Sequence, residues 1–164
     1  MPEITWFGWI HTGLGIIALL SGFYTLVKYK VISLNTNSGK TYLFTTFLTA
    51  VSALAIFKHG GFGVAHALAV LTLLALLAGG IAEKTQLLGK LGSYAQALCY
   101  SATLLFHMVP AITDGLMRLP VHDPIVKNIE DPMLKGFYLA FLVAYLLGFI
   151  AQTMWLRKSN EVPA

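Results

Sequence analysis

Charged side chains are scarce in this sequence. Only 11% of its 164 residues are Asp, Glu, Lys or Arg, and 57% are hydrophobic, whereas soluble domains carry about 25% charged residues. Because charge is costly in hydrocarbon, this deficit indicates a chain that lies in a membrane and contacts its lipid. The sequence also lacks a basic stretch interleaved with aromatic residues. Its net charge of +4 is therefore expected to set membrane orientation and not to bind nucleic acid.

Cysteine is nearly absent as well. The single Cys99 lies inside an apolar run, so no disulfide framework can form and a packing role is expected. No CxxC or HExxH pattern occurs, which removes the usual sequence signatures of metal sites. The apolar runs carry no acidic or basic residue near their centres, and this argues against an ion-coupled transporter.

Five apolar segments approach the length of about 20 residues that crosses a bilayer. They cover residues 6–27, 41–58, 62–82, 91–112 and 133–155. Pro110 in the fourth segment predicts a kink, and the three prolines of 113–132 predict an ordered outer loop lying on the bundle. The sequence thus predicts an all-α integral membrane helix bundle of about five spans, in a single domain over residues 1–164.

Basic residues are shared unequally between the two ends of such a bundle. One side receives Lys28, Lys30, Lys40, Lys84, Lys90, Arg157 and Lys158, and the other receives Lys58, Arg118, Lys127 and Lys135. Since cytoplasmic loops carry the excess of Lys and Arg, the first side is predicted to be cytoplasmic and the N-terminus to lie outside. The basic residues next to the spans on the cytoplasmic side, and Glu83 beside Lys84, are predicted to lie among lipid headgroups.

A short turn, Lys58 to His66, joins the second and third apolar runs. Three glycines in four residues (Gly60, Gly61 and Gly63) allow a tight reversal of the backbone. The flanking runs are therefore expected to be antiparallel neighbours, with His59 at the end of one helix and His66 about one turn into the next.

Histidines gather at the predicted outer side. At about 1.5 Å per residue, His11, His66 and His107 fall at similar depths, roughly 6–9 Å below the outer edge. His59 is shallower, and His122 lies in the outer loop. An ionisable group inside a membrane span is a functional-site hypothesis by default, although an intramembrane histidine is also often simply hydrogen-bonded to a neighbouring helix.

Two imidazoles from facing helices suffice to ligate haem iron. We predict one b-type haem near the outer face. His66 and His107 are the first choice of axial ligands, because they lie on different spans at matching depth, and His11 is the second choice for either place. Glycines and aromatic residues near that level would suit a flat macrocycle, although small residues also allow close helix packing. These residues are Gly13, Gly15, Gly22, Trp6, Phe7, Trp9, Phe62 and Phe106.

Polar residues near the histidines offer supporting contacts. Asp114 and Arg118 are four residues apart, which predicts a helical ion pair, and Asp114 could orient an imidazole. Lys58 and Arg118 are placed to meet haem propionates. Hydroxyl and amide side chains within the spans are expected to bond between helices, namely Thr45, Thr46, Thr49, Ser52, Gln96, Ser101 and Thr103.

Two other functions fit the same pattern. His11, His66 and His107, with His59 as a fourth ligand, could instead hold copper or zinc, since neutral imidazole suits both metals. The chain could also be a non-catalytic accessory subunit of a larger membrane complex. Whether it is an enzyme stays open at the level of the sequence.

Gly92 to Pro120, with its His-x-x-Pro-x-x-Thr-Asp and Arg-Leu-Pro motifs, resembles a family of small multi-histidine polytopic membrane proteins of bacteria. That likeness implies the bacterial inner membrane. The outer-side histidines are similar in kind to those of cytochrome b561-like haem-binding bundles. This second resemblance implies a four-helix haem core with one peripheral helix, and electron transfer. The partner of the predicted haem would be a quinol or a periplasmic electron carrier. Those bundles commonly carry a haem near each face, so the absence of cytoplasmic-side histidines here implies at most one.

Overall fold

The computed structural model describes residues 5–56, 61–85 and 87–161, and every regular element in this part of the chain is helical. The helices are α1 (Trp6–Tyr29), α2 (Asn37–Leu54), α3 (Val64–Lys84), α4 (Gly92–Arg118) and α5 (Pro132–Glu161), with a 3₁₀ turn, η1 (Gly89–Leu91), before α4. The expectation of an all-α bundle is confirmed.

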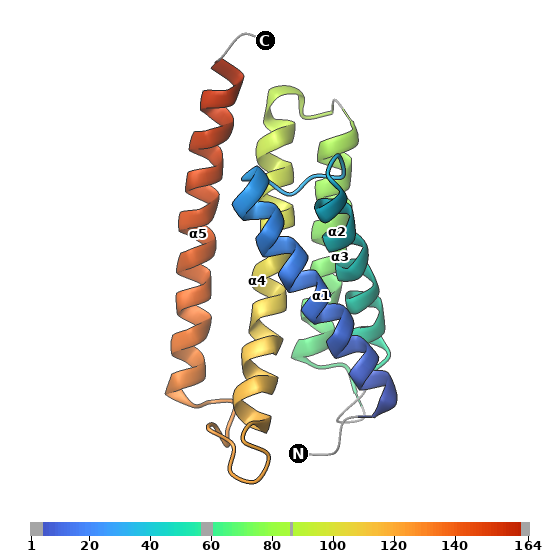
Figure 1. Cartoon of the computed structure of the whole chain (residues 1–164), viewed down its shortest axis with the longest axis vertical. Coiled ribbons are helices and arrows are strands. Elements are labelled where there is room, and N and C mark those ends of the chain that lie inside the picture. Colours follow the sequence, from blue (N-terminus) through green and yellow to red (C-terminus); the bar gives the residue numbers. More distant parts are fainter. Residues whose placement is uncertain (1–4, 57–60, 86, 162–164) are drawn as a thin grey trace.

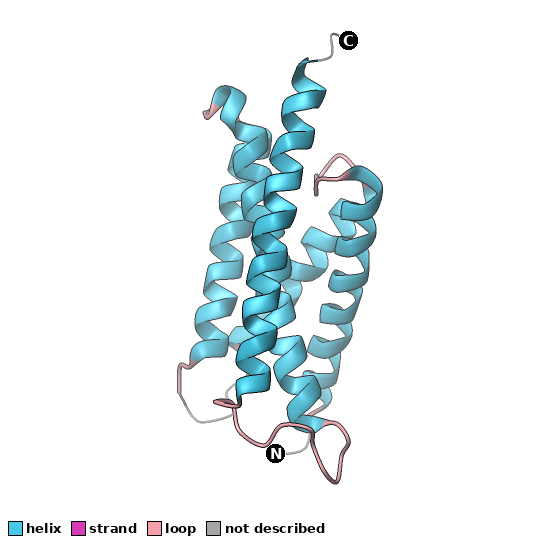
Figure 2. Cartoon of the chain, turned by 90° about the vertical axis from the view of Figure 1, so that its left-hand side faces the viewer, coloured by secondary structure: helices cyan, strands magenta, loops and turns pink. Residues whose placement is uncertain are grey.

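The five helices run alternately up and down (Figure 1). In that view α1 begins at the lower end of the bundle and α5 finishes at the upper end. The start of the first helix and the end of the last helix therefore lie at opposite ends of the bundle, as expected. Helix α2 packs against α1 and α3, whereas α4 packs against α3, α5 and α1. Figure 2 shows α5 as a long helix along one side of the bundle. The predicted antiparallel neighbours, α2 and α3, are indeed adjacent.

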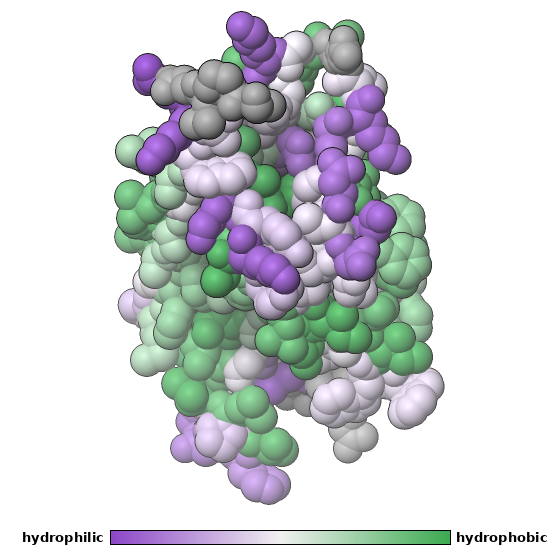
Figure 3. All heavy atoms as spheres, turned by 45° about the horizontal axis from the view of Figure 1, so that its top comes forward, coloured by the Kyte–Doolittle hydropathy of each residue, from purple (hydrophilic) through white to green (hydrophobic). Residues whose placement is uncertain are grey.

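Within the described residues, four stretches are long and apolar enough to cross a membrane: α1, α3, the continuous Gly89–Arg118 segment and α5 up to Ser159. By length and composition this is therefore a membrane protein, and its many exposed apolar side chains suit contact with lipid. Figure 3 shows hydrophilic side chains gathered at the upper end above a largely hydrophobic surface.

Helix α2 is the exception among the five expected spans. It has only 18 residues, and hydroxyl side chains lower its hydropathy. Thr45, Thr46 and Thr49 are all buried, so these polar groups face neighbouring helices instead of lipid. This buried face of threonines explains why an apolar-run criterion recognises α2 poorly, although Phe44 and Phe47 on its other side are exposed.

The end of α4 and both ends of α2 differ from the sequence-based expectation. Helix α4 does not end at residue 112 but continues through Pro110 to Arg118, so the loop covers 119–131 instead of 113–132. Thr113 in this extra part contacts the Tyr138 hydroxyl of α5 at 2.6 Å, and Asp114 pairs with Arg118. These contacts in the last turns of α4 stabilise the helix beyond the proline, which by itself removes only one backbone donor.

Helix α2 begins at Asn37, four residues before the predicted start. Thr36 is its N-cap, and the Thr36 hydroxyl accepts a 3.1 Å hydrogen bond from the Gly39 amide. Turn-forming residues such as threonine are also good N-caps, so the polar stretch read as loop contains the first turn of the helix. At its other end α2 ends at Leu54, before the predicted residue 58, and residues 57–60 lie outside the described part of the chain.

The cap of α2 yields a stability prediction. A Cβ added at Gly39 would lie 2.1 Å from the Ser33 carbonyl oxygen and 2.7 Å from Thr36 Oγ1. The backbone contact cannot be relieved by a rotamer change, so Gly39→Ala is expected to destabilise the protein by about 1–3 kcal/mol. Thermal unfolding in detergent measures this. Gly13→Ala is the control, because a Cβ there meets nothing within 4 Å; equal midpoints for both variants would contradict the prediction.

The buried core lies where α1, α2 and α4 cross. Its cluster comprises Ala18, Ile32, Tyr42, Leu43, Tyr100 and Leu104. Gly22 of α1 permits this crossing, because a Cβ there would come within 2.9 Å of both the Tyr42 ring and Leu104. From this contact α1 runs obliquely away from α4 toward the lower end (Figure 1). Gly22 thus serves close helix packing at the crossing.

Candidate functional site

His11 lies in the lower half of α1 and faces α2. Its Nδ1 atom is 2.9 Å from Ser52 Oγ, and Ser52 Oγ donates its only hydrogen to the Thr49 carbonyl at 3.0 Å. With the Ser52 hydrogen directed to the Thr49 carbonyl, Ser52 Oγ is placed to accept a hydrogen bond from His11 Nδ1–H. A hydrogen bond of this kind orients the ring of a metal-ligating histidine.

His107 projects from α4 toward the same helix. Its Nε2 atom is 3.2 Å from Thr46 Oγ1, and its ring meets the Tyr42 ring edge to face, with centroids 6.5 Å apart. Helix α2 thus holds two histidines, from α1 and α4, in one part of the bundle.

The two histidines are not at the same depth. Their partners Ser52 and Thr46 are six residues apart on α2, which corresponds to about 9 Å along the helix axis. The expectation of matching depth rested on a fourth span ending at residue 112. Because α4 continues to Arg118, His107 lies eleven residues from the helix end instead of five.

His66 has a structural task. It is the third residue of α3, and its Nδ1 accepts a 3.2 Å hydrogen bond from the Gly63 amide, which satisfies a backbone donor at the start of the helix. The side chain is buried and lies beside the Phe62 ring, with centroids 5.2 Å apart. An accepting Nδ1 leaves the proton of a neutral ring on Nε2, so His66 offers no lone pair to a metal in this geometry.

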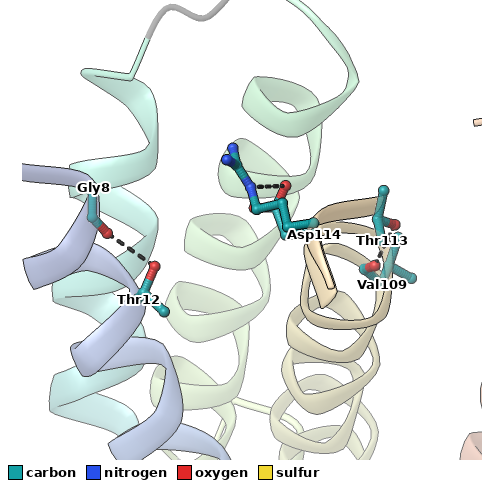
Figure 4. A network of polar contacts seen from close by, with 6 residues as sticks. Gly8, Thr12, Val109, Thr113 and Asp114 are labelled. Carbon is teal, nitrogen blue, oxygen red and sulfur yellow. Dashed lines mark hydrogen bonds and ion pairs between the residues drawn. The ribbon is translucent and has the colours of Figure 1, made fainter. Parts of the chain in front are cut away.

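The predicted ion pair between Asp114 and Arg118 is confirmed, with 3.5 Å between Arg118 Nε and Asp114 Oδ1. The Arg118 side chain is only 17% exposed. Figure 4 shows Asp114 on the side of α4 that faces α1 and α3, opposite Thr113. The hydrogen bonds described above for His11 and His107 are made with hydroxyls of α2. Asp114, which was predicted to orient an imidazole, forms an ion pair with Arg118.

Other predicted residues of the histidine site lie elsewhere. Lys58 and His59 fall outside the described residues, and His122 is exposed in the loop after α4. Trp6, Trp9 and Phe62 are 81%, 57% and 69% exposed. These three rings therefore face the surroundings of the bundle, and their contact with a macrocycle stays a prediction.

Among the described residues, no three His, Cys, Asp or Glu side chains form a group that could hold a metal ion. The four-histidine copper or zinc site includes His59, which that part of the chain does not cover. What the described residues bring together is a pair, His11 and His107.

Most of the hydroxyl and amide side chains expected to bond between helices do so. Besides Ser52 and Thr46, Thr103 contacts the Tyr42 hydroxyl, Ser101 Oγ donates to Gln152 Oε1 at 2.9 Å, and Gln96 Nε2 donates to the Ile32 carbonyl at 2.8 Å. Thr45 and Thr49 differ, because their hydroxyls donate to carbonyls one turn earlier in α2.

A polar cluster at the upper end was missed by the sequence reading. Glu83 Oε1 accepts hydrogen bonds from Ser33 Oγ at 2.5 Å and from the Leu34 amide at 2.7 Å, and Oε2 accepts from the Tyr100 hydroxyl at 3.0 Å. Glu83 therefore turns inward and holds the α1–α2 loop onto α3 and α4, and its prediction as a headgroup residue is wrong. The sequence did contain a signal for this contact, because Glu83 is an acidic residue at the end of a span and the loop before α2 is rich in hydrogen-bond donors.

Helix α5 contributes to the same anchoring of the loop. Gln152 is buried, and its Nε2 donates to the Lys30 carbonyl at 2.9 Å while its Oε1 accepts from Ser101. The α1–α2 loop is consequently bonded to α3, α4 and α5. The upper end is thus fixed by long-range polar contacts that no local pattern in the sequence reveals.

No family model, curated protein or solved structure matches this chain. The two resemblances noted in the sequence therefore stay predictions. The class that the fold and composition define is a helical membrane protein.

Proposed function

We propose that this membrane protein binds one b-type haem in the lower half of the bundle, with His11 and His107 as axial ligands, and transfers electrons through it. The observation that carries the proposal is that histidines from two different helices, His11 of α1 and His107 of α4, both contact hydroxyls of α2, those of Ser52 and Thr46. Two imidazoles from separate helices suffice to hold a haem. His66, which the sequence favoured as a haem ligand, is not part of this proposal because its Nδ1 accepts the hydrogen bond that caps α3.

The number of donors favours haem over a bare metal ion. Protein zinc sites use at least three protein ligands, whereas a haem iron needs two axial imidazoles at most, because the macrocycle supplies the other bonds. The described residues provide a histidine pair and no group of three.

The surrounding residues would act on binding and orientation. Arg118, mostly buried at the end of α4, would meet a propionate, and Lys58 was predicted to do the same. The His107 ring would exchange its contact with Thr46 Oγ1 for the iron. When bound, haem supplies reversible one-electron chemistry, with a quinol or a periplasmic electron carrier as the partner.

The proposal includes the membrane in which the protein lies and its orientation there. The upper end carries the excess of Lys and Arg, so it would face the cytoplasm and the histidine pair would lie toward the outside. With four helices long and apolar enough to cross a membrane, the bacterial inner membrane is the proposed site.

The test is an optical spectrum of the protein produced with added haem precursor and purified in detergent, oxidised and then reduced with dithionite. We expect a Soret band and sharpened α-bands on reduction, with about one iron per chain in metal analysis of the same sample. Stoichiometric copper or zinc in a colourless protein would overturn the haem proposal in favour of the metal site. A colourless, metal-free protein would overturn both and leave the accessory-subunit hypothesis.

A further inference from the structure

An apolar groove of about 750 Å³ opens between α2 and α3 toward the upper end of the bundle. Phe44 and Phe47 of α2 line one side, and Leu76, Leu77 and Ile81 of α3 line the other. Most of these side chains are exposed, so the groove is open to the lipid that surrounds the helices. It lies apart from the histidine pair, because no histidine lines it.

Two lysines also line this groove. Lys40 lies in the first turn of α2 and Lys84 is the last residue of α3, and both side chains are exposed. Glu83, next to Lys84, cannot neutralise them because it turns inward to Ser33, Leu34 and Tyr100. In the described chain no carboxylate forms an ion pair with Lys40 or Lys84.

We propose that this groove binds one anionic phospholipid from the surrounding leaflet. An acyl chain matches the apolar lining, and the phosphate matches the two cations at the helix ends, where lipid headgroups lie. Basic pockets between membrane helices on the cytoplasmic side are a known way of selecting anionic headgroups. The upper end, with its excess of basic residues, is the end where such lipids would be met. The binding is independent of the proposed haem.

Native mass spectrometry in detergent tests the proposal, with phosphatidylglycerol and phosphatidylcholine of identical acyl chains as probes. We expect the protein to bind one phosphatidylglycerol about tenfold more tightly than phosphatidylcholine. The double variant Lys40→Gln/Lys84→Gln should lose that selectivity. Lys90→Gln/Lys158→Gln is the matched control, because it removes the same charge from exposed upper-end residues that do not line the groove, and it should keep the selectivity.

A second variant tests the groove itself. Gly80 lines it, and a Cβ there would be 3.8 Å from the Tyr100 hydroxyl, an ordinary contact. Gly80→Leu should therefore fill the groove without disturbing the helix and weaken binding of both lipids. Ala78→Leu is the control, because Ala78 is exposed and outside the groove. Equal losses from both lysine pairs, or tight binding by Gly80→Leu, would overturn the proposal and indicate nonspecific lipid contact.

Discussion

His11→Ala and His107→Ala are each expected to remove bound haem almost completely, and His66→Ala is expected to retain it. The first two variants delete an axial ligand from a pair held by α2 hydroxyls. The third deletes a helix cap, which costs about 1 kcal/mol of stability but no ligand. The ratio of Soret absorbance to protein absorbance, measured on folded protein from size-exclusion chromatography, gives the haem content of each variant.

Two substitutions on α2 separate ligation from positioning. Thr46→Val keeps the side-chain shape but removes the hydroxyl beside His107 Nε2, so it should leave haem content unchanged. Ser52→Ala removes the acceptor of the His11 Nδ1–H. The imidazole then becomes a weaker electron donor to iron, which favours the ferrous state, and the midpoint potential should rise. A redox titration measures this shift, which a purely structural role of Ser52 would not produce.

Opposite results would reassign the ligands. If His66→Ala loses haem while His11→Ala keeps it, the axial pair is His66 and His107, and the capping contact from the Gly63 amide must break on binding. If the three variants all keep haem, the histidine site is not the haem site.

Glu83→Ala is expected to cause the largest loss of stability among single substitutions at the upper end. It removes the acceptor of three hydrogen bonds, from Ser33, the Leu34 amide and Tyr100. Hydrogen bonds to a charged group contribute about 1.5–3 kcal/mol each, but Glu83 is only partly buried, so water replaces some of the loss. A total of about 3 kcal/mol is expected, seen as a lower midpoint of thermal unfolding in detergent.

Two comparisons sharpen the Glu83 experiment. Glu83→Gln keeps one carbonyl acceptor and should lose markedly less stability than Glu83→Ala. Glu130→Ala removes an exposed carboxylate whose 2.7 Å pair with Lys135 is screened by water, so it should leave the midpoint nearly unchanged. A Glu83→Ala midpoint equal to that of Glu130→Ala would show that the loop is not held by Glu83.

Local patterns were enough to find the helices but not to place their ends. The ion pair of Asp114 with Arg118 was predictable because it depends on a spacing of four residues in one helix. The continuation of α4 past Pro110 was not, since it involves Thr113 reaching Tyr138 on another helix. The error in the depth of His107 followed directly from that missed continuation.

The histidine site also combines features that local sequence patterns predict with features that contacts between helices decide. The sequence indicated that His11 and His107 belong to one end of the bundle, because both lie in spans near the predicted outer side. It could not show which groups meet these two imidazoles, because Ser52 and Thr46 lie across a helix interface from them. It also could not separate His66 from them, because a capping role is recognised only when the ring is seen to accept from the Gly63 amide.

The sequence by itself determined that this protein is helical and suited to a membrane, because hydrophobicity and span length are properties of composition and local order. The tertiary structure alone decided which polar groups meet. Glu83 anchors the loop before α2, Lys40 and Lys84 share one groove, and His11 and His107 lie against the same helix. These pairings join residues far apart in the chain, and they depend on how the helices pack and where each helix ends.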